Sequence, residues 1–367
     1  MKKNSLRDVH DLGQSIWLDY FDREIMDSGK LKTLIEEYGV SGITSNPSIF
    51  EKAINNSSDY DEDIAAISRQ KNNNEDIFYS LAIKDIKRAA DYFIPAFLKS
   101  NGEDGFVSIE VSPHLAYDTE GTIQQARQLW KAIDRRNVMI KIPATAEGLP
   151  AIRKCISEGI NINITLLFGL PRYEEVIEAY LTGLEDRVKA KQPIDQIVSV
   201  ASFFLSRIDV IIDPVLEEKK LTKLKGEVAI ASAKKAYAIY KSIFSGDRFK
   251  ALENNGAKRQ HLLWASTSSK DPSFSDVKYV EALVGKETIN TITIETLEAF
   301  RDHGWADDIL EEGFDHAYDV MAQLKKNGID IDAITQQLEN EGIEKFNQAY
   351  DALMNSIDKK KRKVLAS

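Results

Sequence analysis

Short apolar segments alternate along the chain with longer amphipathic segments. Eight apolar segments have the length of a β-strand, and most are rich in β-branched or aromatic residues. They span residues 15–21, 39–46, 105–112, 138–145, 161–168, 197–204, 261–267 and 288–294. Helical patterns lie between and after them, for example over residues 81–94, 122–135, 172–189, 226–245 and 295–303.

This alternation predicts an α/β fold with a parallel sheet. Eight strands close a (β/α)8 TIM barrel, and a doubly wound open sheet is the alternative that spacing leaves open. Residues 48–101 after the second strand and residues 305–367 after the eighth exceed a minimal barrel, and both are expected to form extra helices. Because no linker rich in proline, glycine or serine divides the chain, we expect one domain over residues 1–367, with its core at about residues 12–304.

Polar residues recur on one side of the predicted strands, where alternate residues face opposite sides of the sheet. Val107, Ile109 and Val111 form an apolar side, whereas Glu110 faces the other way. In a barrel, the polar sides point to the interior and meet near the carboxyl ends of the strands, where barrel enzymes place their chemistry. The residues expected there are Asp19, Asn46, Glu110, Lys141, Asn163, Thr165 and Ser202.

Lys141 is the most informative of these residues, because lysine is almost never fully buried without a partner. An apolar pocket disfavours the ammonium form of a lysine, and a neutral amine can attack a carbonyl to form a Schiff base. The protonated imine then accepts electrons during carbon–carbon cleavage, while Asp19 and Glu110 could divide the acid and base roles. For any single asparagine or serine in the set, an ordinary polar strand end is the simpler interpretation.

The composition restricts the partners and the compartment. The 367 residues carry a net charge of −10, which disfavours nucleic acid and anionic membranes but allows a local basic pocket for a small phosphorylated ligand. Cys155 is the single cysteine, which excludes an intramolecular disulfide and fits a reducing compartment. No apolar segment approaches the ~20 residues of a membrane span, and none follows residues 1–5 as in a signal peptide. We therefore expect a cytoplasmic protein.

Several motifs resemble those of the transaldolase family. They are, in chain order, residues 42–50 (GITSNPSIF), 108–111 (SIEV), 138–145 (VMIKIPAT), 161–168 (NINITLLF) and 202–209 (SFFLSRID). The resemblance runs from about Leu12 to beyond His303, and the chain length is similar to that of the longer bacterial-type transaldolases. It implies a class I aldolase barrel with the Schiff-base lysine on the fourth strand.

The resemblance also implies an activity and a role for each residue. A dihydroxyacetone unit would pass from sedoheptulose 7-phosphate to glyceraldehyde 3-phosphate, giving erythrose 4-phosphate and fructose 6-phosphate in the pentose phosphate pathway. Lys141 would be the nucleophile, Glu110 would relay protons with a water held by Thr165, and Asp19 would move the proton of the substrate hydroxyl. The residues expected to hold donor hydroxyls are Asn46, Asn163 and Ser202. No cofactor or metal is expected, because the imine itself accepts the electrons.

The phosphate-binding end follows the family less closely. Arg207 matches the family's phosphate-binding arginine, whose fork of donors suits phosphate. In residues 265–270 (ASTSSK), Ser266 matches the family's serine, but Ser268 stands where the family has a second arginine. Lys270 is expected to supply that charge, although residues 266–269 also fit an ordinary polar loop.

Two other functions fit the same residues. One is a lyase similar to fructose 6-phosphate aldolase, which releases free dihydroxyacetone from the same lysine. The other is a non-catalytic barrel that binds sugar phosphates. Glu110 and Asp19 together with the long chain favour the transferase. The sequence does not define the oligomeric state, and a homodimer is one option.

Overall fold

The computed structural model describes residues 5–70 and 73–366 and contains a closed barrel of eight parallel strands in chain order. The strands are β1 (Gln14–Asp19), β2 (Val40–Thr44), β3 (Val107–Glu110), β4 (Val138–Pro143), β5 (Ile162–Leu167), β6 (Ser199–Phe204), β7 (His261–Ala265) and β8 (Thr288–Ile292). Each falls on one of the predicted segments, and β8 pairs with β1 to close the ring. The predicted barrel is confirmed, and the open-sheet alternative is wrong.

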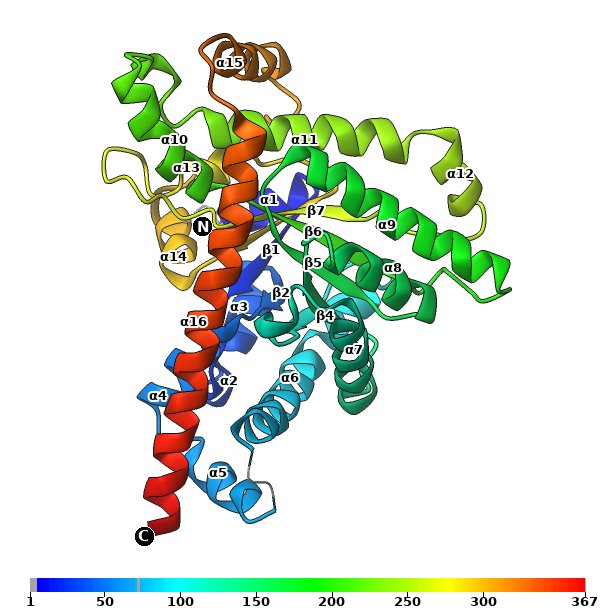
Figure 1. Ribbon diagram of the computed structural model, residues 1–367, viewed down its shortest axis with the longest axis vertical. Helices are drawn as coiled ribbons and strands as arrows, with labels where there is room; N and C mark the ends of the chain where they lie inside the picture. Colours follow the sequence, from blue (N-terminus) through cyan, green and yellow to red (C-terminus); the bar gives the residue numbers. More distant parts are fainter. Residues whose placement is uncertain (1–4, 71–72, 367) are drawn as a thin grey trace.

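Helices surround the barrel, as the amphipathic segments predict (Figure 1). The surrounding helices are α1 (Ser5–Asp11), α2 (Arg23–Asp27), α3 (Lys30–Tyr38), α7 (Thr119–Ile133), α8 (Gly148–Glu158), α9 (Leu170–Lys189), α10 (Ser206–Glu218), α11 (Val228–Phe244), α12 (Asp247–Glu253), α13 (Lys278–Glu281) and α14 (Ile294–His303). Short 3₁₀ helices cover Pro113–Leu115 and Thr222–Leu224. Helix α7 ends earlier than its pattern predicts, because Asp134 adopts a left-handed backbone (φ 51°) that caps it.

A large aromatic side chain, that of Trp17, fills the barrel interior below the polar residues. Trp17 of β1 is fully buried, and its indole N–H donates to Asp104 Oδ1 at 2.8 Å. A Cβ atom at Gly42 of β2 would lie 2.6 Å from the Trp17 ring, so glycine is needed beside it. This packing closes the lower part of the barrel and leaves the carboxyl ends of the strands for a site.

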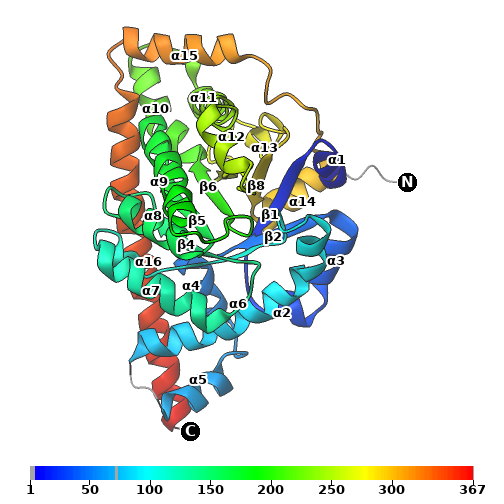
Figure 2. The same ribbon diagram turned by 90° about the vertical axis from the view of Figure 1, so that its right-hand side faces the viewer.

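The two predicted additions to the barrel form helices. Between β2 and β3 lie α4 (Pro47–Asn56), α5 (Asp61–Ser68) and α6 (Asn74–Lys99), and after α14 lie α15 (Phe314–Lys326) and α16 (Ile331–Ala366). Helix α16 runs the length of the molecule, from α15 at one end to α5 at the other (Figures 1 and 2). It packs against α4, α5 and α6, so the C-terminal addition covers the insertion after β2.

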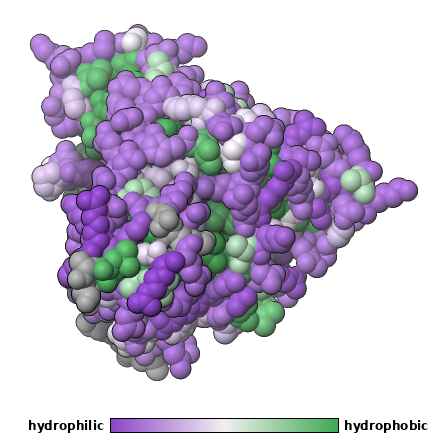
Figure 3. Space-filling model, turned by 60° about the horizontal axis from the view of Figure 1, so that its bottom comes forward, coloured by the Kyte–Doolittle hydropathy of each residue, from purple (hydrophilic) through white to green (hydrophobic). Residues whose placement is uncertain are grey.

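The exterior is mostly hydrophilic on the face that contains the end of the molecule near α5, and hydrophobic residues there form small separate groups (Figure 3). In the part of the chain that the structure describes, no helix has both the length and the apolar character needed to cross a membrane. Residues 1–4, which belong to the N-terminal segment used in the signal-peptide prediction, lie outside the described residues.

Candidate active site

Strand register places three predicted residues side by side inside the barrel. Glu110 of β3 pairs with Lys141 of β4, and Lys141 pairs with Asn163 of β5. All three are buried, with exposed fractions of 6%, 4% and 0%, respectively. A parallel ladder thus aligns a carboxyl, an amine and an amide at one level near the carboxyl ends of their strands.

Among the described residues, one hydrogen bond holds the Lys141 amine. Its Nζ atom donates to the backbone carbonyl of Ser45 at 3.1 Å, in the turn that follows β2. Glu110 Oε2 lies 3.9 Å from the same nitrogen, close enough for electrostatic attraction but too far for a hydrogen bond. The carboxyl group can therefore exchange a proton with the amine or its adduct after a small movement or through one bridging molecule.

Glu110 has an unusual environment for a carboxyl group. Both of its side-chain oxygens are buried, and neither has a hydrogen-bond partner among the described residues; the same holds for Thr165 Oγ1. Burial raises the pKa of Glu110 to about 7, the charge of Lys141 opposes this rise, and Asp19 adds to it. A carboxyl group with a pKa near neutrality can both give and accept a proton at the pH of the cell.

Asp19 ends β1 and is held by a threonine on the neighbouring strand. Thr44 Oγ1 donates to Asp19 Oδ1 at 2.7 Å and lies 2.7 Å from the hydroxyl of Thr291. Burial raises the pKa of Asp19, although Lys141 and Thr44 act in the opposite direction. Thr44 is not among the residues predicted from the sequence, but it lies on the same side of its strand as Gly42 and Asn46, so strand parity also points to it.

The predicted hydroxyl-binding residues have defined orientations. Ser202 Oγ donates to Asn163 Oδ1 at 2.7 Å, and Asn163 Nδ2 donates to Ser108 Oγ at 3.0 Å. These two bonds fix the Asn163 amide. Asn46 caps helix α4, because its Oδ1 atom accepts from the N–H of Ile49 at 3.0 Å, which leaves the amide NH₂ group directed away from the helix.

A cavity of about 680 Å³ opens at this end of the barrel. Phe346 of α16 contributes to its wall, so the C-terminal helix reaches the mouth of the barrel. The predicted residues that line the cavity are Asp19, Asn46, Lys141, Ser202, Arg207, Ser266 and Lys270. Glu110, Asn163 and Thr165 are buried beside Lys141 and are not part of the lining.

The predicted phosphate-binding residues share one side of the cavity. Arg207 lies near the start of α10, with its guanidinium 5.7 Å from the centre of the Phe204 ring. The Ser206 and Ser266 hydroxyls are 2.9 Å apart, and Ser206 N–H donates to the Ser266 carbonyl at 3.0 Å, which ties the loop after β7 to α10. Ser266 has a left-handed backbone (φ 55°), a strain of about 1–3 kcal/mol that is typical of binding sites.

The charged groups of Arg207 and Lys270 can bind a ligand. Within residues 5–70 and 73–366, no hydrogen bond or ion pair is formed by the side chain of either one. Burial lowers the pKa of Arg207, while Asp19 and Glu341 oppose that change. Two cations without a bound partner beside a polar loop favour an anionic ligand.

Metal-ligating residues do not gather at this site. Over the described ranges, no group of three or more histidine, cysteine, aspartate or glutamate side chains is arranged to hold a metal ion. Cys155 is buried in α8, and burial raises the pKa of its thiol to about 12. A thiol in this state is a packing group rather than a nucleophile.

Comparison with known proteins gives a consistent result over nearly the whole chain. Residues 16–357 match the family described as transaldolase/fructose-6-phosphate aldolase. The transaldolase of Trichodesmium erythraeum is 48% identical, with 99% of each chain covered. Transaldolase 2 of a Nostoc species is 48% identical with 98% of each chain covered, and the transaldolase of Thiobacillus denitrificans is 43% identical with 96% of this chain and 99% of its own covered. The chain therefore belongs to the transaldolase/fructose-6-phosphate aldolase family.

Proposed function

We propose that this protein is a transaldolase that transfers a dihydroxyacetone unit between sugar phosphates through a Schiff base on Lys141. The observation that carries the proposal is the buried Lys141 amine, 3.9 Å from the Glu110 carboxylate and at the edge of a cavity with two available cations. The donor would be sedoheptulose 7-phosphate and the acceptor glyceraldehyde 3-phosphate. Full-length similarity to proteins named transaldolase supports the same activity.

Formation of the imine needs proton transfer at the Lys141 nitrogen. The neutral amine attacks the ketose carbonyl carbon and gives a carbinolamine, which then loses its hydroxyl group as water. Glu110 supplies the proton for that departure and takes a proton when the imine is hydrolysed, because its pKa of about 7 allows both. A water held between Glu110 and Thr165 would bridge the carboxyl group and the nitrogen.

Cleavage of the carbon–carbon bond needs a base on the other side of the substrate. Asp19 takes the proton from the hydroxyl on the fourth carbon as the bond to the third carbon breaks, and the bonding electrons move into the protonated imine. The aldehyde leaves, and an enamine remains on Lys141. When an acceptor aldehyde binds, the same steps run in reverse and Asp19 returns its proton. Asn46, Asn163 and Ser202 would position the hydroxyls of the bound unit.

Transfer requires that the enamine persist until an acceptor aldehyde binds. Helix α16 contributes the Phe346 ring to the wall of the cavity, where an apolar group limits the access of water. This feature supports transfer over the lyase alternative, in which dihydroxyacetone is released. The non-catalytic alternative does not account for a buried lysine beside a carboxyl group that has no hydrogen-bond partner.

Borohydride reduction in the presence of fructose 6-phosphate tests the proposal. Peptide mass mapping should find the mass of a reduced dihydroxyacetone or ketose adduct on Lys141, and Lys141→Ala should show none. Without an acceptor aldehyde, release of free dihydroxyacetone should be slow; with an acceptor, the unit should appear in the product ketose instead. Release at the same rate without acceptor would identify a lyase, and an unmodified Lys141 would identify a binding protein.

The domain organisation and the location follow from the same interpretation. We infer one barrel domain over residues 1–367, supported by the packing of α16 on the insertion helices α4, α5 and α6. A cytoplasmic location and a homodimer stay predictions, which fractionation and light scattering would test.

A further inference from the structure

Five cationic side chains line the cavity, and they differ in their contacts with the rest of the protein. They are Arg23, Lys52, Lys141, Arg207 and Lys270. Lys141 is the proposed nucleophile, and Arg207 and Lys270 are the phosphate ligands predicted from sequence. Arg23 and Lys52 are not among the residues predicted from the sequence, and their contacts in the structure differ.

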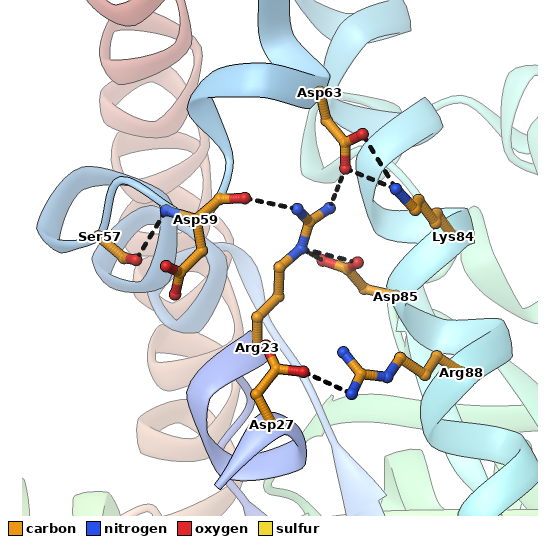
Figure 4. A network of polar contacts seen from close by, with 8 residues as sticks. All are labelled: Arg23, Asp27, Ser57, Asp59, Asp63, Lys84, Asp85 and Arg88. Carbon is orange, nitrogen blue, oxygen red and sulfur yellow. Dashed lines mark hydrogen bonds and ion pairs between the residues drawn. The ribbon is translucent and has the colours of Figure 1, made fainter.

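Arg23 is fully engaged by the protein itself (Figure 4). Its Nε atom lies 3.0 Å from Asp85 Oδ1, one terminal nitrogen donates to the carbonyl of Asp59 at 2.7 Å, and the other lies 2.8 Å from Asp63. The guanidinium also covers the Tyr60 ring at 4.3 Å. These contacts direct the guanidinium toward the protein. They also fix residues 57–63, the segment that follows α4.

Lys52 differs from Arg23 in its exposure and in its contacts. It lies on α4, its side chain is exposed, and its ammonium group forms no hydrogen bond or ion pair within the described part of the chain. Because Asn46 caps the start of α4 and the Arg23 contacts fix the segment after its end, the helix holds Lys52 at the cavity wall. A cation that is held at a cavity without a hydrogen bond or ion pair to the protein is available for an anion.

The cavity lining also carries acidic side chains. Asp22, Glu24, Asp59 and Glu295 are part of the same lining. The pKa of Glu295 is lowered by hydrogen bonds from its own backbone and from Thr293, and then by the charges of Lys52 and Lys270. The two lysines are therefore within electrostatic range of one carboxylate at the mouth. These carboxylates oppose the binding of a phosphorylated ligand, and the charge of Lys52 offsets part of that repulsion.

We propose that Lys52 is a third phosphate ligand, which acts with Arg207 and Lys270 on the phosphorylated substrates; this inference rests on the proposed function. A phosphate monoester carries a charge of about −1.5 to −2 near pH 7. In the proposed reaction, the phosphate group lies one carbon farther from the reacting bond in sedoheptulose 7-phosphate than in fructose 6-phosphate. A lysine on a flexible four-carbon stem can follow that change more easily than a rigid guanidinium.

Acceptor kinetics of Lys52→Gln test the assignment. We expect the KM for glyceraldehyde 3-phosphate to rise roughly 10-fold, the loss typical of one charge-assisted hydrogen bond. The KM for unphosphorylated glyceraldehyde should stay within about 2-fold, because that acceptor carries no phosphate for Lys52 to hold. Lys52→Arg should restore most of the affinity. Lys131→Gln on α7, outside the cavity lining, is the control for the same change in net charge.

Two outcomes would overturn the assignment. One is an unchanged KM for glyceraldehyde 3-phosphate, and the other is an equal loss for both acceptors, which would indicate a general effect on α4. Borohydride trapping on Lys141 in the same variants separates this result from the fate of the proposed function. If the wild-type protein is not trapped, the proposed function fails; if trapping is normal and the KM does not respond, only the role of Lys52 fails.

Discussion

The Nζ atom of Lys141 lies 3.9 Å from Oε2 of Glu110, and both side chains are almost fully buried. A buried carboxylate and ammonium at this separation are only partly compensated, because no direct hydrogen bond joins them. The raised pKa of Glu110 relieves part of this cost, because a neutral carboxyl group needs no charged partner. The same geometry places beside the Lys141 nitrogen a group that can give or accept a proton, which imine formation requires.

Replacing Lys141 should abolish the chemistry while preserving the fold. In Lys141→Ala we expect transfer activity to fall by at least about 10³-fold, since the variant lacks the buried amine that forms the imine beside Glu110. Thermal unfolding should show a folded protein, because burial raises the pKa of Glu110 and its carboxyl group can be neutral without Lys141. Residual activity close to wild type would mean that another amine forms the Schiff base.

The stability of the protein should respond to the titration of Glu110. Its pKa is raised by burial from the ordinary value of 4.5 to about 7 in the folded state. The folded protein therefore binds more protons than the unfolded chain between these pH values, and the free energy of unfolding should fall as the pH rises from 4.5 to 7. Glu110→Gln should remove up to about 1.4 kcal/mol per pH unit of this slope in urea unfolding. An identical slope in the variant would contradict the raised pKa.

Asp19 should act on bond cleavage rather than on imine formation. We expect Asp19→Ala to lower the turnover number by about 10²–10⁴-fold, the range for loss of a general base. Borohydride trapping with fructose 6-phosphate should persist in the variant, because Glu110 and Lys141 are intact. Equal losses of trapping and turnover would show that Asp19 supports the site as a whole.

The contacts of the buried Arg23 should contribute more to the stability of the protein than those of the exposed Lys84. Arg23 and Asp85 are buried (side-chain exposure 10% and 4%), so Arg23→Met leaves a buried carboxylate unpaired and should cost about 3–5 kcal/mol. Lys84 contacts Asp63 from an exposed position, and Lys84→Met should cost less than about 1 kcal/mol. Chemical denaturation of the two variants checks this difference, and similar losses would argue against burial as the cause.

Gly42 should not tolerate even one methyl group. The Cβ atom of Gly42→Ala would lie 2.6 Å from the rigid Trp17 ring, and the displacement needed should cost about 1–3 kcal/mol. Ser41→Ala on the same strand, facing the other side, serves as the matched control. A midpoint of urea unfolding that is equal in both variants would show that the ring can move freely.

The amino-acid sequence alone was enough to predict the eight-stranded barrel and the direction of the side chains at its mouth. The alternation along a strand is a local property of the backbone, so the parity of Glu110 and Lys141 can be assigned without knowledge of any neighbouring strand. The resemblance of motifs then indicated the chemistry. For these reasons Asp19, Ser202 and Arg207 were selected before their surroundings were known.

Tertiary structure decided the relationships between residues that are distant in the chain. Strand register sets the Glu110–Lys141 separation and brings Thr44 to Asp19, and register depends on the packing of the whole barrel. Lys52 resembles any exposed lysine on an amphipathic helix until α4 is placed against the cavity. The sequence likewise did not predict that α16 reaches the mouth of the barrel. An amphipathic pattern defines the apolar face of a helix but not the surface against which that face packs.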